Sequence, residues 1–184
     1  AYIPNGRVFG ISKLVRELII EIGEDPTREG LKDTPRRIAD AYTEIFSGYD
    51  SDSELSVQFS EDSEMVVAKN IQFYSMCEHH ILPFFGTIQI AYIPNGRVFG
   101  ISKLVRVVEK FSKRLQIQER ITKNIADELY SQGVKGVAVV AEAEHLCMKM
   151  RGVKNDAKVT TSAFRGELDD QKTKEELLKA IQNK

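Results

Sequence analysis

Every histidine and every cysteine of this 184-residue chain falls within two short segments, residues 77–80 and 145–147. The three histidines and two cysteines would be scattered along the chain if their positions served no common purpose. The sequence therefore predicts that these two segments, about 65 residues apart, meet at one site. Any fold that the chain adopts has to allow this meeting.

A metal site is the interpretation that these residue types favour. Cys77 and His80 are three residues apart, so that a tight turn brings both to one ion. Cys147 lies on a predicted strand, whose face it shares with His145. Two thiolates and one imidazole suit zinc, and three protein ligands leave a fourth position for water, as in catalytic zinc sites. His79 and His145 are then available to move protons.

Three other interpretations stay open on spacing alone. A structural zinc with four ligands would use Cys77, Cys147, His145 and either His79 or His80. Buried cysteines and hydrogen-bonded core histidines would require five such residues to cluster by accident. A redox pair is disfavoured because the two cysteines do not form a Cys-x-x-Cys motif.

The bulk composition predicts an ordinary globular protein, with 42% hydrophobic and 29% charged residues. The net charge of −1 leaves no overall basic excess to hold a nucleic-acid backbone. The sequence contains no apolar run long enough to span a membrane and no signal-peptide pattern at its start. Two cysteines cannot form a disulfide framework. We therefore expect a cytoplasmic protein that binds neither nucleic acid nor a membrane.

One 16-residue sequence, AYIPNGRVFGISKLVR, occurs twice, at residues 1–16 and 91–106. A functional repeat would recur at a regular period and diverge, whereas these copies are identical and occur only twice. We interpret the first copy as artefactual or non-functional, and we expect function at the second copy. The second copy continues the patterns of the segments on both sides of it.

Helical periodicity and helix-start signals predict helices at both ends of the chain. Apolar residues recur with helical spacing over residues 11–22, and Thr34 as N-cap with Pro35 announces a second helix before Gly48. Residues 50–63, rich in Ser, Asp and Glu, indicate a surface connection. Near the C-terminus, Thr173 and Glu176 form a capping box for a final helix that carries Leu177, Leu178 and Ile181.

The middle of the chain reads as mixed strand and helix, which predicts an α+β fold. Extended segments are expected at residues 65–68 and 71–74, and residues 87–93 and 97–99 form a predicted hairpin around Pro94, Asn95 and Gly96. Residues 101–112 and 118–130 are helical by periodicity. Residues 137–140 begin a buried strand that extends to Met150.

Four motifs resemble those of the type I GTP cyclohydrolases, in the family's order and approximate spacing. The resemblance runs from about residue 24 to the C-terminus. The motifs are Phe73-Tyr74-Ser75-Met76-Cys77-Glu78-His79-His80, Gly100-Ile101-Ser102-Lys103-Leu104, Gln116-Ile117-Gln118-Glu119-Arg120 and His145-Leu146-Cys147.

The resemblance implies an enzyme that acts on GTP at a zinc ion held by Cys77, His80 and Cys147. Water adds at C8 of the guanine, the imidazole ring opens and formate leaves. Rearrangement and reclosure then give 7,8-dihydroneopterin triphosphate, the first step of folate and pterin biosynthesis. By the family's roles, His145 transfers a proton to the purine imidazole and His79 belongs to the catalytic pocket.

The resemblance also implies the groups that bind GTP. Glu119 matches the family's guanine-binding carboxylate, which two adjacent N–H donors of guanine suit, and Gln118 completes the pocket. Without the family match, residues 118–120 would be interpreted as a solvated helix face. Ser102 lies near the ribose. Asp40 stands where some members carry a lysine, and an acidic residue there cannot hold phosphate. The cations that match the triphosphate site are Lys103, Arg106, Arg151 and Arg37.

The implied architecture is the tunnelling fold, an antiparallel sheet with helices packed on one face. Its subunits form a multi-subunit barrel, here a homodecamer of two face-to-face pentamers with active sites between subunits. The chain then divides into the duplicated residues 1–16, a helical region 17–49 and a catalytic domain 64–184. The rivals are another pterin or deazaguanine enzyme of this fold, and a zinc-stabilised GTP-binding or structural protein without turnover.

Overall fold

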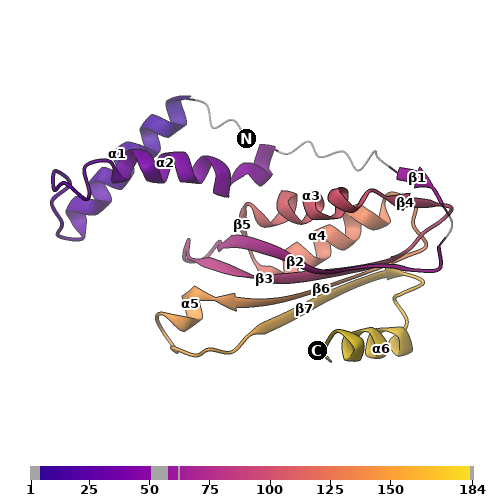
Figure 1. Cartoon of the computed structure of the whole chain (residues 1–184). Coiled ribbons are helices and arrows are strands. Elements are labelled where there is room, and N and C mark those ends of the chain that lie inside the picture. Colours follow the sequence, from indigo (N-terminus) through magenta and orange to yellow (C-terminus); the bar gives the residue numbers. More distant parts are fainter. Residues whose placement is uncertain (1–4, 51–57, 62, 183–184) are drawn as a thin grey trace. The chain divides into compact units, whose positions relative to one another are not determined.

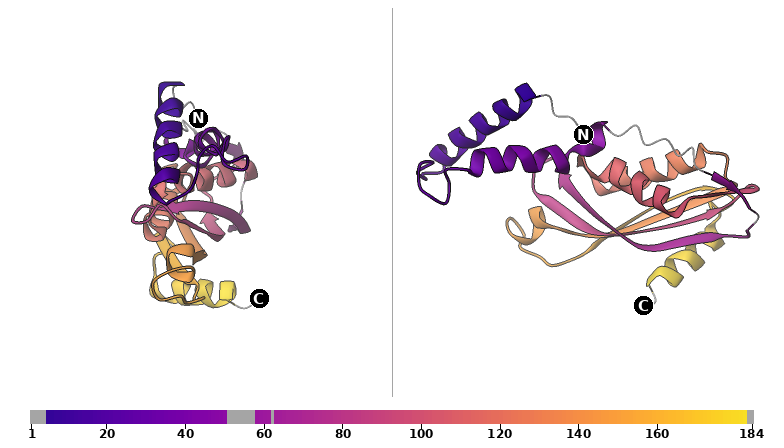
Figure 2. Two further views of the ribbon diagram at one scale, coloured as in Figure 1. Left: turned by 90° about the vertical axis from the view of Figure 1, so that its left-hand side faces the viewer. Right: turned by 45° about the horizontal axis from the view of Figure 1, so that its top comes forward.

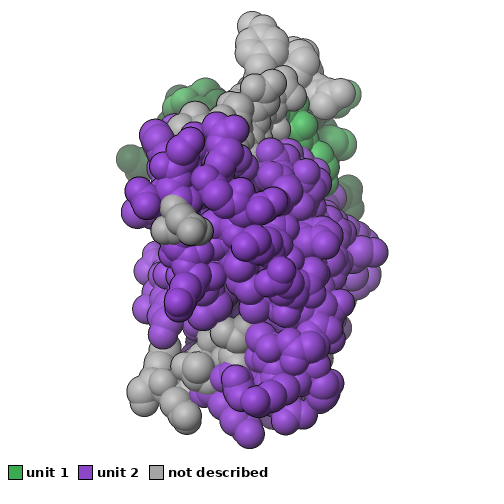
Figure 3. Space-filling view, turned by 90° about the vertical axis from the view of Figure 1, so that its right-hand side faces the viewer, with its two compact units in different colours: residues 1–51 green, residues 52–184 purple. Residues whose placement is uncertain are grey.

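The computed structural model describes residues 5–50, 58–61 and 63–182, and the chain divides into two units, residues 1–51 and 52–184 (Figure 3). The first unit holds α1 (Asn5–Glu21), α2 (Thr34–Ile45) and the short 3-10 helix η1 (Ser47–Asp50). The two α-helices pack against each other. Both predicted helices are confirmed. α1 begins earlier than expected, at Asn5, and α2 has Asp33 rather than Thr34 at its cap position.

The second unit is built on one five-stranded sheet in the order β5-β2-β3-β6-β7 (Figure 1). All neighbours are antiparallel except β2 and β5, which are parallel. The sheet is strongly curled (Figure 2). The α+β class is thereby confirmed, although β5 and β7 were not predicted. The strands are β2 (Val66–Cys77), β3 (Pro83–Ile93), β5 (Leu115–Gln116), β6 (Gly136–His145) and β7 (Val159–Gly166).

Helices α3 (Ile101–Ser112) and α4 (Gln118–Tyr130) cover one face of this sheet and enclose the main core (Figure 1). Both helices coincide with the predicted residue ranges. Their buried stripes, which include Leu104, Val108 and Ile125, meet apolar side chains such as Ile88 and Ile90 of β3. Helix α6 (Gln171–Gln182) lies on the opposite side of the sheet (Figures 1 and 2). No helix among the described residues is both long and apolar enough to cross a membrane.

The predicted hairpin around residues 94–96 is wrong in its pairing partner. The turn exists, with Gly96 at a φ of 71°, but β4 (Arg97–Phe99) pairs with β1 (Gln58–Ser60) in a separate two-stranded sheet. Side chains hold β4 beside the end of β3: the Phe99 N–H donates to the Tyr92 hydroxyl at 3.0 Å, and the two rings lie 5.0 Å apart. β1 falls in the predicted surface connection 50–63, of which residues 51–57 and 62 lie outside the described residues.

Two further expectations near the C-terminal half need correction. β6 ends at His145 and the chain turns into the short helix α5 (Leu146–Lys149), so that Cys147 lies on a helical turn and not on a strand. α6 begins at Gln171, and the Thr173 N–H donates to Asp170 Oδ1 at 3.0 Å. Asp170, and not Thr173, therefore caps this helix. The side chains of Leu177, Leu178 and Ile181 lie outside the described residues.

Candidate functional site

The sheet topology explains why the two segments that contain histidine and cysteine meet. β2 and β6 are both antiparallel to β3, so they run in the same direction and end at the same edge of the sheet. The register pairs Met76 with Pro83 and Phe84 with His145. The turn between β2 and β3 therefore lies next to the end of β6, and Cys147 follows on α5.

Three residues at this edge form a group that could hold a metal ion. The Sγ atoms of Cys77 and Cys147 and a ring nitrogen of His80 all lie within 4.8 Å of one another. The distance from Cys77 Sγ to His80 Nδ1 is 3.7 Å. Donor atoms around a tetrahedral zinc lie about 3.4–3.8 Å apart, given its bond lengths. The three donors therefore need only small side-chain adjustments to share one ion.

Burial and the neighbouring thiol both act on the pKa of Cys147. Burial raises the pKa of the Cys147 thiol, and the nearby Cys77 thiol raises it further. Cys77 is buried, Cys147 is half-buried and His80 is exposed. Both thiols must lose their protons when a metal binds, so a cation at this position would reverse the upward shift. Because His80 is exposed, the metal group can be reached from solvent on that side.

His145 is held in place beside the metal group by two contacts. Its ring stacks on Phe84, with centroids 4.7 Å apart and planes 4° apart, and its Nε2 lies 2.8 Å from Gln118 Oε1. Gln118 Nε2 donates to the carbonyl oxygens of Ala141 at 3.1 Å and Val159 at 2.9 Å. Because the amide nitrogen is engaged there, Oε1 faces His145 and accepts the Nε2–H. This arrangement selects one tautomer and leaves Nδ1 as the nitrogen that can exchange a proton.

The burial of Gln118 could have been anticipated from the periodicity of α4. Gln118 occupies the same helical stripe as Ile121, Thr122, Ile125 and Leu129, and it is 1% exposed. A solvated face for residues 118–120 is therefore wrong at Gln118, although Glu119 and Arg120 are exposed. The stripe places a polar side chain at a core position, which requires hydrogen-bond partners. Those partners are two backbone carbonyl oxygens and the half-buried His145 ring.

Glu119 and His79 also lie at this end of the sheet. Burial lowers the pKa of His145, and the Glu119 carboxylate opposes this by raising it, so Glu119 is near enough to act on the ring electrostatically. His79 is exposed, with Nδ1 3.8 Å from Cys77 Sγ. Arg151 lowers the pKa of Cys147 as a lesser contribution, which places its charge near α5. A single chain therefore brings together the metal group, both remaining histidines, Glu119 and one cation.

The other residues predicted to bind GTP lie elsewhere. Ser102, Lys103 and Arg106 lie in the first two turns of α3, which follow the Tyr92 end of β3, whereas the metal group lies at its Phe84 end. These ends are roughly 26 Å apart along an extended strand. Ser102, Lys103 and Arg106 therefore do not converge with the metal group of the same chain.

Arg37 lies on α2 in the first unit. Its Nη2 is 3.6 Å from Asp33 Oδ2, one turn earlier. Asp40, which stands where some members of the family carry a lysine, forms an ion pair with Arg36 at 3.1 Å. The acidic side chain at position 40 is therefore neutralised by its own helix.

Comparison with known proteins agrees with this geometry. The family model described as GTP cyclohydrolase I matches residues 13–182. The chain is 53% identical to GTP cyclohydrolase 1 of Hyperthermus butylicus over 174 residues, which cover 94% of this chain and 90% of that protein. It is 52% identical to GTP cyclohydrolase 1 of Aquifex aeolicus, over 93% of this chain and 95% of that protein. A solved structure titled archaeosine synthase QueF-Like in the apo form shares 17% identity, with a TM-score of 0.47 over 58% of this chain and 97% of that chain, a likeness too weak to locate any site residue. A match across almost the whole length, together with relatives above 50% identity, shows that this chain belongs to the GTP cyclohydrolase I family.

Proposed function

We infer that this chain is a GTP cyclohydrolase, which opens the imidazole ring of GTP at C8, releases formate and yields 7,8-dihydroneopterin triphosphate for pterin and folate synthesis. The observation that carries this inference is the placement of a possible metal group beside a histidine of fixed tautomer. Hydrolysis of a purine ring requires both an activated water and a proton donor at the ring nitrogen. Family membership supports the same substrate. A reaction on a free nucleotide also suits the expected cytoplasmic location.

We propose zinc as the metal, held by Cys77, His80 and Cys147. Two thiolates and an imidazole suit zinc, and three protein ligands leave one coordination position open. Zinc bound there would act as a Lewis acid that lowers the pKa of a water molecule. The exposed side of the group, at His80, gives GTP a route of approach.

His145 is proposed to exchange the proton with N7 of the purine as water adds at C8. Addition at C8 builds negative charge on N7, so a positioned proton donor lowers the barrier. The Gln118 contact keeps one proton on Nε2, so Nδ1 is the nitrogen that would take up a proton from water and then give it to N7. Phe84 keeps the ring in one plane by stacking. His79, exposed at the same turn, is the second imidazole that we assign to the catalytic pocket.

Glu119 is proposed to bind the guanine edge. A carboxylate accepts from N1–H and the exocyclic amine of guanine together, and adenine offers no such pair. Glu119 lies in the first turn of α4, is exposed and acts electrostatically on His145. Gln118 would then act on the substrate indirectly, through His145, since its amide groups are engaged inside the subunit.

The triphosphate and ribose are proposed to be held partly by a neighbouring subunit. Lys103, Arg106, Arg151 and Arg37 supply positive charge, with Ser102 beside the ribose. Because α3 begins at the end of β3 remote from the metal group, a second copy has to bring its own α3 to this edge. The separation supports a site shared between two copies, and we propose the homodecamer of two face-to-face pentamers that the family resemblance implies. We assign no site role to residues 1–16.

Two variants separate catalysis from metal holding. Cys147→Ser should lose both zinc and turnover, because it removes a ligand. His145→Ala should retain zinc and lose turnover, because it removes only the proton donor. Zinc content would be measured by elemental analysis, and formate release from GTP would be followed in parallel. Loss of zinc in His145→Ala would instead support a four-ligand structural zinc, and a zinc-stabilised protein without turnover.

A further inference from the structure

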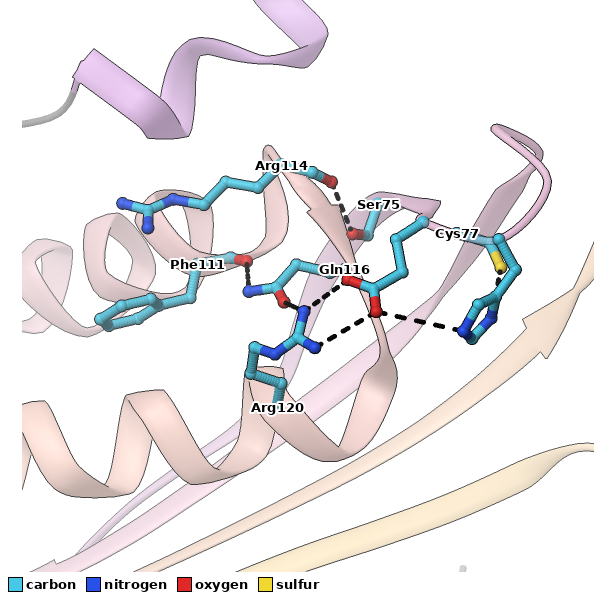
Figure 4. Close-up of polar contacts among 8 residues, drawn as sticks. Ser75, Cys77, Phe111, Arg114, Gln116 and Arg120 are labelled. Atoms are coloured by element: carbon cyan, nitrogen blue, oxygen red, sulfur yellow. Dashed lines mark hydrogen bonds and ion pairs between the residues drawn. The ribbon is translucent and has the colours of Figure 1, made fainter.

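A polar network outside the metal ligands joins the turn after β2 to the first turn of α4 (Figure 4). Arg120 Nη1 lies 2.5 Å from Glu78 Oε2, and Arg120 Nη2 lies 3.2 Å from Glu78 Oε1. The guanidinium and the carboxylate thus pair through two parallel hydrogen bonds, the geometry that gives arginine its directional specificity. The pair joins residues that are 42 positions apart in the sequence.

A buried glutamine fixes the position of Arg120 in this pair. Gln116 is 3% exposed, its Nε2 donates to the Phe111 carbonyl oxygen at 3.0 Å, and its Oε1 accepts from Arg120 Nη1 at 3.2 Å. The Gln116 carbonyl oxygen also accepts the Glu78 N–H at 3.1 Å. Both members of the ion pair are therefore tied to one buried residue of β5. Figure 4 shows Gln116 between Phe111 and the guanidinium of Arg120.

The turn that Glu78 belongs to carries two proposed metal ligands in a conformation that is not intrinsically favoured. Ile81, directly after His80, has a φ of 52°, and a β-branched residue rarely adopts the left-handed region. The turn is closed by the Cys77 N–H donating to Leu82 O and the Ile81 N–H donating to Cys77 O, both at 2.9 Å. A strained backbone conformation of this kind persists only when contacts with the surrounding structure hold it in place.

Arg120, the other member of the ion pair, belongs to the start of α4, which also carries Gln118 and Glu119. Arg120 follows these residues directly in the first turn of α4. A displacement of the turn relative to α4 would therefore separate the metal ligands from Glu119 and from the partner of His145. A displacement of about 1 Å between reacting groups can reduce catalysis about 100-fold.

We propose that Glu78 and Arg120 are positioning residues, whose bidentate ion pair fixes the metal-ligand turn relative to the start of α4. The pair holds Cys77 and His80 ready for the metal and keeps Glu119 in register with it. Its side chains are 43% and 31% exposed, for Arg120 and Glu78, so it contributes little to global stability. The catalytic part of this proposal rests on the proposed function, whereas the metal-holding part does not.

The test compares Glu78→Gln and Arg120→Lys with a matched control on the same helix, Asp127→Asn. Asp127 forms a 2.7 Å ion pair with Arg165 of β7, far from the metal group. Zinc affinity is measured by competition with a chromophoric chelator, metal geometry by the visible spectrum of the Co²⁺-loaded protein, and folding by the thermal unfolding midpoint. Initial rates with GTP give kcat and KM.

Both site variants should bind zinc about 10–100-fold more weakly and show altered Co²⁺ bands. Their kcat should fall about tenfold, with KM for GTP changed less than about threefold, because Glu119 and the phosphate cations remain. Their unfolding midpoints should match that of Asp127→Asn, which should keep wild-type zinc affinity and kcat. Arg120→Lys retains the charge, so it decides the proposal if Glu78→Gln does not fold.

Wild-type zinc affinity in folded Glu78→Gln and Arg120→Lys would overturn the proposal. A second outcome would also overturn it. If the unfolding midpoints of both variants fell far below that of Asp127→Asn, and zinc affinity fell only in proportion to that loss of stability, the pair would be a general stabiliser. If the wild-type protein binds zinc but releases no formate from GTP, the proposed function fails. The zinc and Co²⁺ measurements would still decide the role of the ion pair.

Discussion

Residues 1–16 and 91–106 have the same sequence, and residues 5–16 differ in structure from their counterparts 95–106. In the first copy, residues 5–16 lie entirely within the helix α1. In the second copy, the same twelve residues form a turn, the strand β4 and the beginning of α3. The identical Arg-Val-Phe sequence is helical at residues 7–9 and extended at residues 97–99. Local propensity alone therefore does not decide the conformation of this sequence.

The two copies also bury different side chains. Phe9 is 77% exposed and its counterpart Phe99 is 4% exposed, while Leu14 and Leu104 are 70% and 2% exposed. The order reverses at the next position, where Val15 is 9% exposed and Val105 is 41% exposed. The β-sheet and Tyr92 are available to the second copy and recruit Phe99 and Leu104 into the core. Tertiary contacts thus choose both the conformation and the buried face.

The largest expected difference between the copies is in core packing. Phe99→Ala should lower the free energy of unfolding of the second unit by about 3–5 kcal/mol, because a fully packed ring is removed from the core. Phe9→Ala should change the free energy of unfolding of the first unit, in which Phe9 lies, by less than about 0.5 kcal/mol. Denaturant unfolding of both variants measures the contrast. Equal losses would show that the first copy packs as closely as the second.

The next contrast concerns GTP binding. Lys103→Ala should raise KM for GTP about 10–100-fold, since a hydrogen bond to a charged group contributes about 1.5–3 kcal/mol. Lys13→Ala should leave KM unchanged, because Lys13 lies on α1 without the metal group or a counterpart of Glu119 in its sequence context. Initial-rate kinetics on the two variants decides this. A raised KM in Lys13→Ala would give the first copy a role in binding.

In the smallest contrast, the first copy and not the second has the buried side chain. Val15→Ala should lower the stability of α1 by roughly 1.5 kcal/mol, from the apolar surface of two methyl groups, while Val105→Ala should cost less than about 0.5 kcal/mol. Amide hydrogen exchange of α1 reports the local effect without requiring global unfolding. Faster exchange only in Val15→Ala would confirm that the buried faces of the two copies differ.

The comparison of the two copies also shows which features could be predicted from the sequence and which depend on tertiary contacts. The ranges of α3 and α4 followed from periodicity, because each helix presents one mainly apolar stripe to the sheet. The meeting of residues 77–80 with residues 145–147 followed from chemistry, since thiols and imidazoles have few other reasons to gather. These features depend on residues that are close in the sequence or chemically distinctive.

Features that depend on long-range pairing could not be predicted in this way. The hairpin prediction failed because β4 pairs with β1, about 40 residues earlier, and not with its neighbour β3. Cys147 was placed on a strand because the end of β6 is fixed by its pairing with β3 and not by a local stop signal. The Glu78–Arg120 pair and the Gln118–His145 contact likewise join residues 42 and 27 positions apart.

The most direct test of the account is to incubate the purified protein with GTP, with and without a metal chelator. Formate and a pterin that becomes fluorescent after oxidation would be measured together. We expect both products from GTP and neither after the chelator has removed the metal, with recovery when zinc is added back. Absence of both products, in a sample shown to contain zinc and to be oligomeric, would contradict the assignment and leave a zinc-stabilised GTP-binding or structural protein.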